Sequence, residues 1–135
     1  MTDFENCSSC KNIPKTLMVE KLHTPKRLPK EVSELSTIGG YATDGELRKC
    51  QHCLTYYIYH YDHDSESGVG NGYTDEGITR ISNAEAKKML PDLLKSAEAS
   101  LDYWQKDLDR PASQQFIVSH QKEVTRLQKE IKILK

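Results

Sequence analysis

The stretch Cys50-Gln51-His52-Cys53-Leu54-Thr55-Tyr56-Tyr57 joins a Cys-x-x-Cys pair directly to a run of residues that favour β structure. A second pair, Cys7-Ser8-Ser9-Cys10, lies near the N-terminus. A short Cys-x-x-Cys loop can place two sulfurs on one metal ion, and four thiolates are a common ligand set for structural Zn²⁺. The sequence therefore predicts one tetrahedral zinc site, with Zn²⁺ as the cofactor and Cys7, Cys10, Cys50 and Cys53 as its ligands.

Other uses of the cysteines stay open at the level of sequence. Disulfides and unliganded thiols are two of them, and His52, inside the second pair, could replace a cysteine as ligand. A thioredoxin-like redox role is disfavoured, because neither pair lies between a strand and a helix of a βαβ unit. Between Cys10 and Cys50 lie 39 residues (50 − 10 − 1), so this segment has to fold between the two pairs.

The residue pattern gives no indication of an enzyme. A zinc ion held by four thiolates has no open position for water, which argues against hydrolytic zinc chemistry. The chain also has no Ser-His-Asp order, no phosphate-binding glycine-rich loop and no helical His-Glu-x-x-His motif. We therefore expect a structural metal and no catalytic residues.

Residues 50–57 resemble the zinc-ribbon knuckle of many small bacterial proteins of uncharacterised function. In those proteins the second cysteine is commonly followed by glycine, whereas Leu54 stands at that place here. The resemblance covers the two cysteine pairs and the hairpin but not the C-terminal half, and it implies the same four cysteines as ligands. Zinc ribbons serve in nucleic-acid binding, subunit contacts and scaffolding, so the resemblance implies no single function.

Length and composition are typical of one polar globular domain with a modest core. The 135 residues are 36% hydrophobic, with a mean hydropathy of −0.71 and a net charge of −1. No apolar run reaches the roughly 20 residues of a membrane helix, and the N-terminus lacks the pattern of a secretory signal. We expect no membrane association and a cytoplasmic location, where thiols stay reduced.

Charge is distributed unevenly along the chain. Residues 11–30 contain six Lys or Arg against one Glu, whereas residues 44–79 contain seven Asp or Glu against two basic residues. Such runs are typical of solvated surface. The near-neutral total gives the whole molecule no strong attraction to nucleic acid or anionic membranes.

The middle of the chain has the pattern of an antiparallel β-hairpin. A turn at residues 43–46 and a short strand at 46–49 lead into the second cysteine pair. Residues 54–63 then alternate with period two and are rich in tyrosine, which predicts a strand. The turn-forming residues 64–72 predict a loop, and residues 76–81 predict the returning strand, with Ile78 and Arg80 on one face.

Between the two cysteine pairs the pattern is weaker. Ile13, Leu17, Met18 and Leu22 have spacings that fit one face of a short helix over residues 11–24, with Pro14 in its first turn. Residues 30–35 predict another helical turn. Ile38-Gly39-Gly40 predicts a loop, because glycines commonly mark breaks in regular structure.

The C-terminal third predicts two helices. Ser82-Asn83-Ala84-Glu85 fits a capping box at the start of the first, which should kink or break at Pro91 and run to about residue 109. Apolar residues recur at steps of three and four in both helices, as in a coiled-coil-like seam. The positions Leu108–Phe116, Trp104–His120, Leu101–Val124, Ala97–Leu127, Leu94–Ile131 and Leu90–Leu134 pair in mirror order around Arg110-Pro111-Ala112. This order predicts an antiparallel helical hairpin.

The predicted fold class is therefore α+β, a zinc-ribbon-like antiparallel β-hairpin followed by an antiparallel helical hairpin. Residues 1–81 form the zinc-knuckle and β-hairpin part, and residues 82–135 form the helical hairpin. A helical hairpin alone buries only one face of each helix. We therefore expect the two parts to pack as one unit.

Three further groups of residues are candidate sites. His60, Asp62, His63 and Asp64 lie at one strand end and could hold a second metal, although exposed His and Asp are usually only solvated. The strand tyrosines could stack on single-stranded nucleic acid, but no Lys or Arg is interleaved with them, which favours packing against the helices. His120, opposite Trp104, is expected to be a histidine at the edge of the core.

These patterns favour a non-catalytic structural-zinc protein that acts as a protein-interaction module. The acidic hairpin suits a basic partner, as in inhibitory or immunity-type proteins, and a homodimer through the helical hairpin stays open. The alternative is a nucleic-acid-binding zinc ribbon that uses two groups of basic residues. These are Lys11, Lys15, Lys21, Lys26, Arg27 and Lys30 in the first half, and Lys122, Arg126, Lys129, Lys132 and Lys135 in the last helix.

Overall fold

The computed structural model describes residues 4–20, 27–64, 73–106 and 113–134. The chain divides into two compact units, one of residues 1–37 and 41–82 and the other of residues 38–40 and 83–135. The first carries the sheet and both cysteine pairs, and the second carries the two helices. That the two parts pack as one unit stays a prediction.

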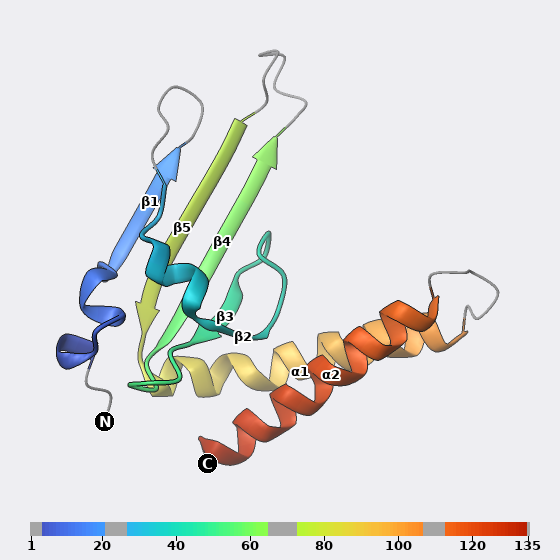
Figure 1. Ribbon diagram of the computed structural model, residues 1–135. Helices are drawn as coiled ribbons and strands as arrows, with labels where there is room; N and C mark the ends of the chain where they lie inside the picture. Colours follow the sequence, from blue (N-terminus) through green and yellow to red (C-terminus); the bar gives the residue numbers. More distant parts are fainter. Residues whose placement is uncertain (1–3, 21–26, 65–72, 107–112, 135) are drawn as a thin grey trace. The chain divides into compact units, whose positions relative to one another are not determined.

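Five strands form one sheet in the order β1-β5-β4-β3-β2 (Figure 1). Their bounds are β1 Thr16–Glu20, β2 Ser36–Gly39, β3 Glu46–Lys49, β4 Tyr56–Asp64 and β5 Tyr73–Ile81. The β1–β5, β4–β5 and β3–β4 pairs are antiparallel. The predicted α+β class is confirmed, and so are the strand at residues 46–49 and the hairpin made by β4 and β5.

The predicted helix at residues 11–24 is wrong, because β1 occupies its middle. Leu17 and Val19 are half-buried and buried, whereas Thr16 and Met18 are exposed, which is the alternation of a strand. Apolar residues flanking the strand happened to fall at helical spacing. The decisive factor is tertiary, since β1 forms a full ladder with β5 from Thr16 opposite Thr79 onward.

The predicted loop at Ile38-Gly39-Gly40 is also mostly wrong, because β2 extends through Gly39. A Cβ atom placed on Gly39 would lie 2.8 Å from Leu127 Cδ2. Glycine is thus needed here for close approach rather than for a turn. Gly40, with φ of 93°, does begin the turn, and the predicted turn near residues 43–46 is present, with φ of 103° at Gly45.

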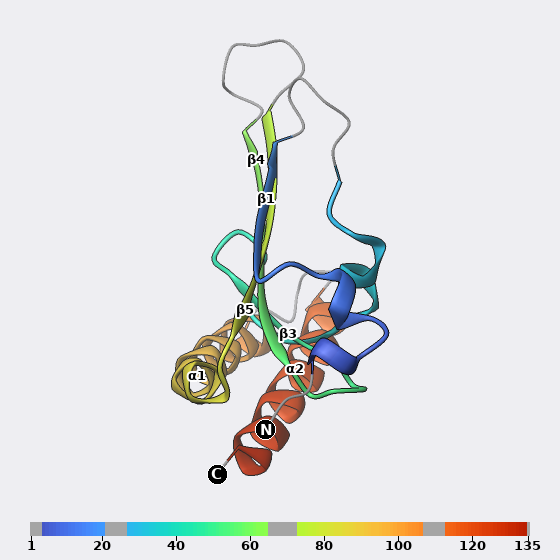
Figure 2. The ribbon, with the colours of Figure 1, turned by 90° about the vertical axis from the view of Figure 1, so that its left-hand side faces the viewer.

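Three 3₁₀ turns cover one face of the sheet in the first unit. They are η1 Phe4–Asn6, η2 Cys10–Asn12 and η3 Lys30–Glu34, of which η3 confirms the predicted helical turn. Figure 2 shows these dark-blue and teal turns on the same side of the strands. The buried core beneath them consists of Cys7, Cys10, Ile13, Val32, Leu35, Cys50, Tyr57 and Ile78. The cysteines are therefore part of the hydrophobic core of this unit.

In the second unit, helix α1 (Asn83–Lys106) begins directly after Ser82, as predicted, and α2 (Ser113–Ile133) runs back beside it (Figure 1). A kink or a break was predicted at Pro91; the break does not occur, since α1 continues through it, and the kink stays a prediction. Pro91 and Lys87, whose carbonyl loses its helical donor, are both exposed. Water can therefore satisfy that carbonyl, which makes the proline tolerable.

Burial in the helices agrees with the predicted seam at three positions, and one predicted pairing differs. Leu90, Ala97 and Leu127 are buried as expected. Trp104, however, stacks on Phe116 with ring centroids 4.3 Å apart, one turn away from its predicted partner His120. The predicted pairing of Leu108, the loop at residues 65–72 and the connection at 110–112 lie outside the described residues. No helix of the described chain is long and apolar enough to cross a membrane.

Candidate metal centre

All four predicted ligands lie together in the first unit. The Sγ atoms of Cys7, Cys10, Cys50 and Cys53 are within 4.8 Å of one another. Two contacts run between the pairs, at 3.7 Å from Cys7 to Cys50 and 3.4 Å from Cys10 to Cys53. Tetrahedral coordination with bonds of about 2.3 Å separates sulfurs by about 3.8 Å. The spacing thus fits one zinc-sized ion and is too long for disulfide bonds of roughly 2.05 Å.

The first knuckle is built by the two 3₁₀ turns at the N-terminus. The N–H of Cys7 donates to Phe4 O at 3.2 Å and the N–H of Lys11 donates to Cys7 O at 3.0 Å, which fixes the loop. The backbone N–H of Cys10, and then that of Ser9, point at Cys7 Sγ. They outweigh burial and lower the pKa of the Cys7 thiol to about 7.

The second knuckle repeats this geometry between β3 and β4. Leu54 N–H donates to Cys50 O at 2.8 Å, and Cys50 N–H donates to Thr55 O at 2.9 Å. Burial raises the pKa of Cys50, while the N–H groups of Cys53 and His52 oppose it by donating to the sulfur. In both pairs the donors are the second and third residues after the first cysteine. Such paired N–H groups stabilise thiolate charge.

Leu54 adopts the left-handed conformation that a glycine provides in the resembled knuckle, with φ of 64°. It is the only non-glycine residue of the described chain with positive φ. Its side chain is 50% exposed, so little packing offsets the strain of roughly 1–2 kcal/mol. Leucine therefore supports the knuckle geometry at an energetic cost.

Leu54→Gly should stabilise the protein by up to about 1 kcal/mol, because relief of strain outweighs the greater entropy of glycine in the unfolded chain. Leu54→Val should destabilise it, since a β-branched residue tolerates positive φ poorly. Urea unfolding of the zinc-loaded protein measures both changes. Equal stabilities for the two variants would contradict a strained knuckle.

Burial of the centre favours a bound cation. Cys10 is fully buried, Cys7 and Cys50 are buried, and Cys53 is half-buried with its Sγ 3.1 Å from Thr55 Oγ1. Burial raises the pKa of the Cys10 thiol, so its thiolate is costly without a compensating charge. A divalent ion supplies that charge, and the donor set of four sulfurs is one that Zn²⁺ prefers.

Arg80 and Tyr57 form the next layer around the cysteines. The Arg80 guanidinium lies 3.7 Å above the Phe4 ring and donates from Nη2 to Ile13 O at 2.9 Å. Burial first, and then Cys10, raise the pKa of Tyr57. Arg80 Nε and Tyr57 Oη are buried without a hydrogen-bond partner among the described residues. Arg80 lies beside Tyr57, and Cys10 contributes to the pKa shift of Tyr57, so this pair adjoins the cysteine cluster.

The sequence did not identify this layer. The strand alternation correctly placed Ile78 and Arg80 on one face, but alternation does not reveal what a face contacts. The face with Ile78 and Arg80 also carries Tyr57, whose ring centroid lies 5.9 Å from the Arg80 guanidinium carbon. Tyr57 and Ile78 share one buried core with Cys7, Cys10 and Cys50. The available signal was an arginine two residues after an apolar isoleucine in the same predicted strand, Ile78-Thr79-Arg80.

The other sequence candidates do not join a comparable site. Among the described residues, the four cysteines are the only group of three or more potential ligands that converge. His52 is exposed and is not part of it, and His60 and Asp62 are also exposed. The side chain of His63 lies outside the described part, so a second metal held by His60, Asp62 and His63 stays a prediction.

Comparison of this chain with protein-family models, with curated proteins and with solved structures found no match. The cysteine cluster is consistent with two Cys-x-x-Cys knuckles, and the likeness to zinc ribbons rests on that geometry alone.

Proposed function

We propose that the protein is a non-catalytic structural-zinc protein that acts as a protein-interaction module. The convergence of four sulfurs from two knuckles within 4.8 Å is the observation that carries the zinc assignment. Cys7 and Cys10 would hold the ion from the N-terminal turns, and Cys50 and Cys53 from the turn between β3 and β4. A closed set of four thiolates leaves no position for substrate, so the bound metal supplies stability and not catalysis.

A row of acidic residues across three strands supports the interaction role. Asp62 of β4 lies opposite Asp75 of β5, which lies opposite Glu20 of β1. Like charges placed directly opposite each other destabilise a sheet. Asp75 Oδ1 is in addition buried without a hydrogen-bond partner in the described part of the chain. A cationic partner would offset both costs.

The neighbouring row on the same face offers apolar surface. Met18 is 61% exposed and lies directly opposite Gly77. Because residues two apart share a strand face, Met18 is on the side of the sheet that carries Asp75. An exposed methionine beside carboxylates suits a basic, partly apolar protein surface. An inhibitory or immunity-type role in a reducing, cytoplasmic compartment is the specific form that we propose.

Removal of the opposed charges tests this surface. Asp62→Asn together with Asp75→Asn should raise stability by about 0.2–1 kcal/mol, because the like-charge pair of Asp62 and Asp75 is relieved. The same change should weaken partner binding at least tenfold. Affinity purification from the host with wild-type and variant bait, followed by calorimetry with the purified partner, measures the second effect.

Asp92→Asn with Asp102→Asn is the matched control, because both residues are exposed on α1 and the charge change is identical. This control should leave partner binding unchanged. A partner that binds the wild type and both double variants equally would refute the proposed surface. A partner lost equally with both would show that only net charge matters.

The nucleic-acid alternative rests on exposed basic residues, of which Lys11, Lys15 and Lys30 lie in the first unit. It predicts binding to DNA or RNA that falls steeply with salt. Fluorescence anisotropy at low salt tests this binding, and its absence would remove the nucleic-acid alternative.

For the homodimer alternative, sedimentation equilibrium of the zinc-loaded protein is the test, since a strict monomer excludes the dimer.

A further inference from the structure

A cavity of about 370 Å³ opens in the first unit between η3 and the sheet. Its apolar part is an aliphatic wall made by Leu28, Val32 and Leu35, with the ring of Tyr59 beside them. Small-molecule sites have this size and this composition, an apolar lining with a few convergent polar groups. No cysteine lines the cavity, so it is distinct from the metal centre.

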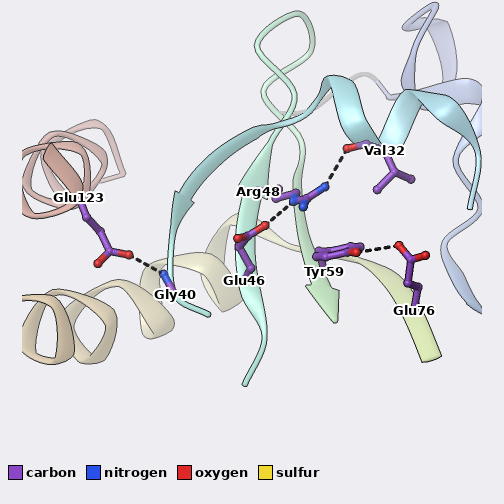
Figure 3. A network of polar contacts seen from close by, with 7 residues as sticks. All are labelled: Val32, Gly40, Glu46, Arg48, Tyr59, Glu76 and Glu123. Atoms are coloured by element: carbon purple, nitrogen blue, oxygen red, sulfur yellow. Dashed lines mark hydrogen bonds and ion pairs between the residues drawn. The ribbon is translucent and has the colours of Figure 1, made fainter. Parts of the chain in front are cut away.

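Arg48 lines this cavity and makes two hydrogen bonds that Figure 3 draws as dashed lines. Its Nε donates to Glu46 Oε2 at 2.6 Å and its Nη1 donates to Val32 O at 3.1 Å. The guanidinium carbon lies 3.9 Å from the centroid of the Tyr59 ring. These contacts fix the guanidinium plane. A preorganised guanidinium loses little entropy when it binds an anion.

Tyr59 and Glu76 form the acidic side of the cavity. Tyr59 Oη donates to Glu76 Oε2 at 2.7 Å (Figure 3). Burial, and then Glu76, raise the pKa of Tyr59, so its hydroxyl stays protonated and continues to donate. Glu76 is therefore a hydrogen-bonded carboxylate that repels a second anion placed next to it.

The charge at the cavity favours an anionic ligand in spite of Glu76. The cavity is lined by three basic residues, Arg27, Lys30 and Arg48, which we call the cationic rim, and by one carboxylate, Glu76. Arg27 and Lys30 are exposed at the cavity, where they can meet an incoming ligand before it loses its hydration.

We propose that this cavity binds a small amphipathic anion. A carboxylate or phosphate head pairs with the cationic rim, away from Glu76. An apolar body packs on the aliphatic wall and the Tyr59 ring. A neutral ligand lacks the ion pairs, and a cationic ligand meets the exposed charges of Arg27 and Lys30. This proposal concerns a small ligand and does not depend on the protein partner proposed above.

Ligands with one aromatic body and different heads test the proposal. Benzoate, phenyl phosphate, benzamide and benzylamine are titrated into the full-length zinc-loaded protein and followed by amide chemical shifts. Benzoate or phenyl phosphate should shift the amide signals of Leu28, of residues 30–35 and of Tyr59. Each should bind at least tenfold more tightly than benzamide. The better of the two anions identifies the head group. Benzylamine should not bind at the cavity.

Charge-matched variants locate the site. Arg27→Gln with Lys30→Gln should weaken anion binding about tenfold, which corresponds to about 1.4 kcal/mol. Lys11→Gln with Lys15→Gln makes the same change in net charge at exposed positions outside the cavity and should have less than a twofold effect. Arg48→Lys keeps the charge but loses the planar donor fork, and it should weaken binding if the head contacts Arg48.

Each remaining outcome would overturn the proposal. Benzamide binding as tightly as benzoate would remove the role of charge. Equal losses in the two glutamine double variants would mean a general electrostatic effect and no site. Shifts confined to other residues, or no shift with any of the four compounds, would show that the cavity does not bind this class of ligand. These readings stand even if Arg48→Lys fails to fold.

Discussion

Replacing Cys10 with serine should abolish metal binding at the proposed zinc centre and unfold the first unit. Cys10 Sγ is fully buried and lies 3.4 Å from Cys53 Sγ, so no water can take its place without opening the core. Structural zinc sites contribute apparent binding energies of about 10–16 kcal/mol at neutral pH, far more than the net stability of a small domain. Loss of one thiolate therefore removes more free energy than the remaining packing can supply.

Elemental analysis should show the zinc content falling from about one ion per chain to nearly none. Amide signals of residues in β1, β4 and β5 should collapse toward random-coil positions at the same time. A strong chelator added to the wild type should have the same effect, by mass action. Ser8→Ala, an exposed change inside the same knuckle, is the control and should keep both zinc and fold. A well-folded Cys10→Ser protein without zinc would refute a structural metal.

Leu127→Ala should destabilise the second unit by about 2–5 kcal/mol, the range for truncating a fully buried leucine. Leu127 is fully buried, and its side chain packs against the backbone of Gly39. Removal of the isobutyl group leaves a void that the strand backbone cannot fill. Urea unfolding followed by the fluorescence of Trp104 measures the loss, and Gln128→Ala on the exposed side is the control.

A second substitution makes this prediction specific to one contact. Gly39→Ala in the wild type should destabilise the protein by about 1–3 kcal/mol, because the new methyl group meets Leu127 Cδ2 at 2.8 Å. In the Leu127→Ala background the same change should be neutral or stabilising, since it fills the void. A double-mutant cycle should therefore show coupling, and strict additivity would contradict the contact.

Features that depend on short stretches of sequence were predictable. The two Cys-x-x-Cys spacings, the alternation in residues 54–63 and the capping signal at Ser82 each depend on a few neighbouring residues. These gave the four clustered cysteines, β4 and the start of α1. The zinc-ribbon resemblance also marked Leu54 as unusual, and the structure shows how leucine fills that position, with φ of 64°.

Features that depend on distant partners were not predictable. Residues 16–20 form a strand only because β5 lies beside them, and the flanking apolar residues imitate a helix. Gly39 has the local sequence of a loop glycine, and only its close approach to the Leu127 side chain shows why glycine is needed there. The cavity needs Arg48, Tyr59 and Glu76 from three different strands, which no local period brings together. Arg80 belongs to the same class, because its neighbour Phe4 is far away in sequence.

The pairing of β1 with β5 sets the order of events during translation. Thr16 pairs with Thr79, a separation of 63 residues (79 − 16), so the edge strand cannot dock until most of the sheet has left the ribosome. At about 5–20 residues per second, the nascent N-terminal segment waits roughly 3–13 s for that strand. Cys7 and Cys10 lack their partner cysteines only until Cys53 is made, 43 residues after Cys10 (53 − 10), so they are unshielded nascent thiols for roughly 2–9 s. All four cysteines are therefore synthesised before β5 completes the sheet.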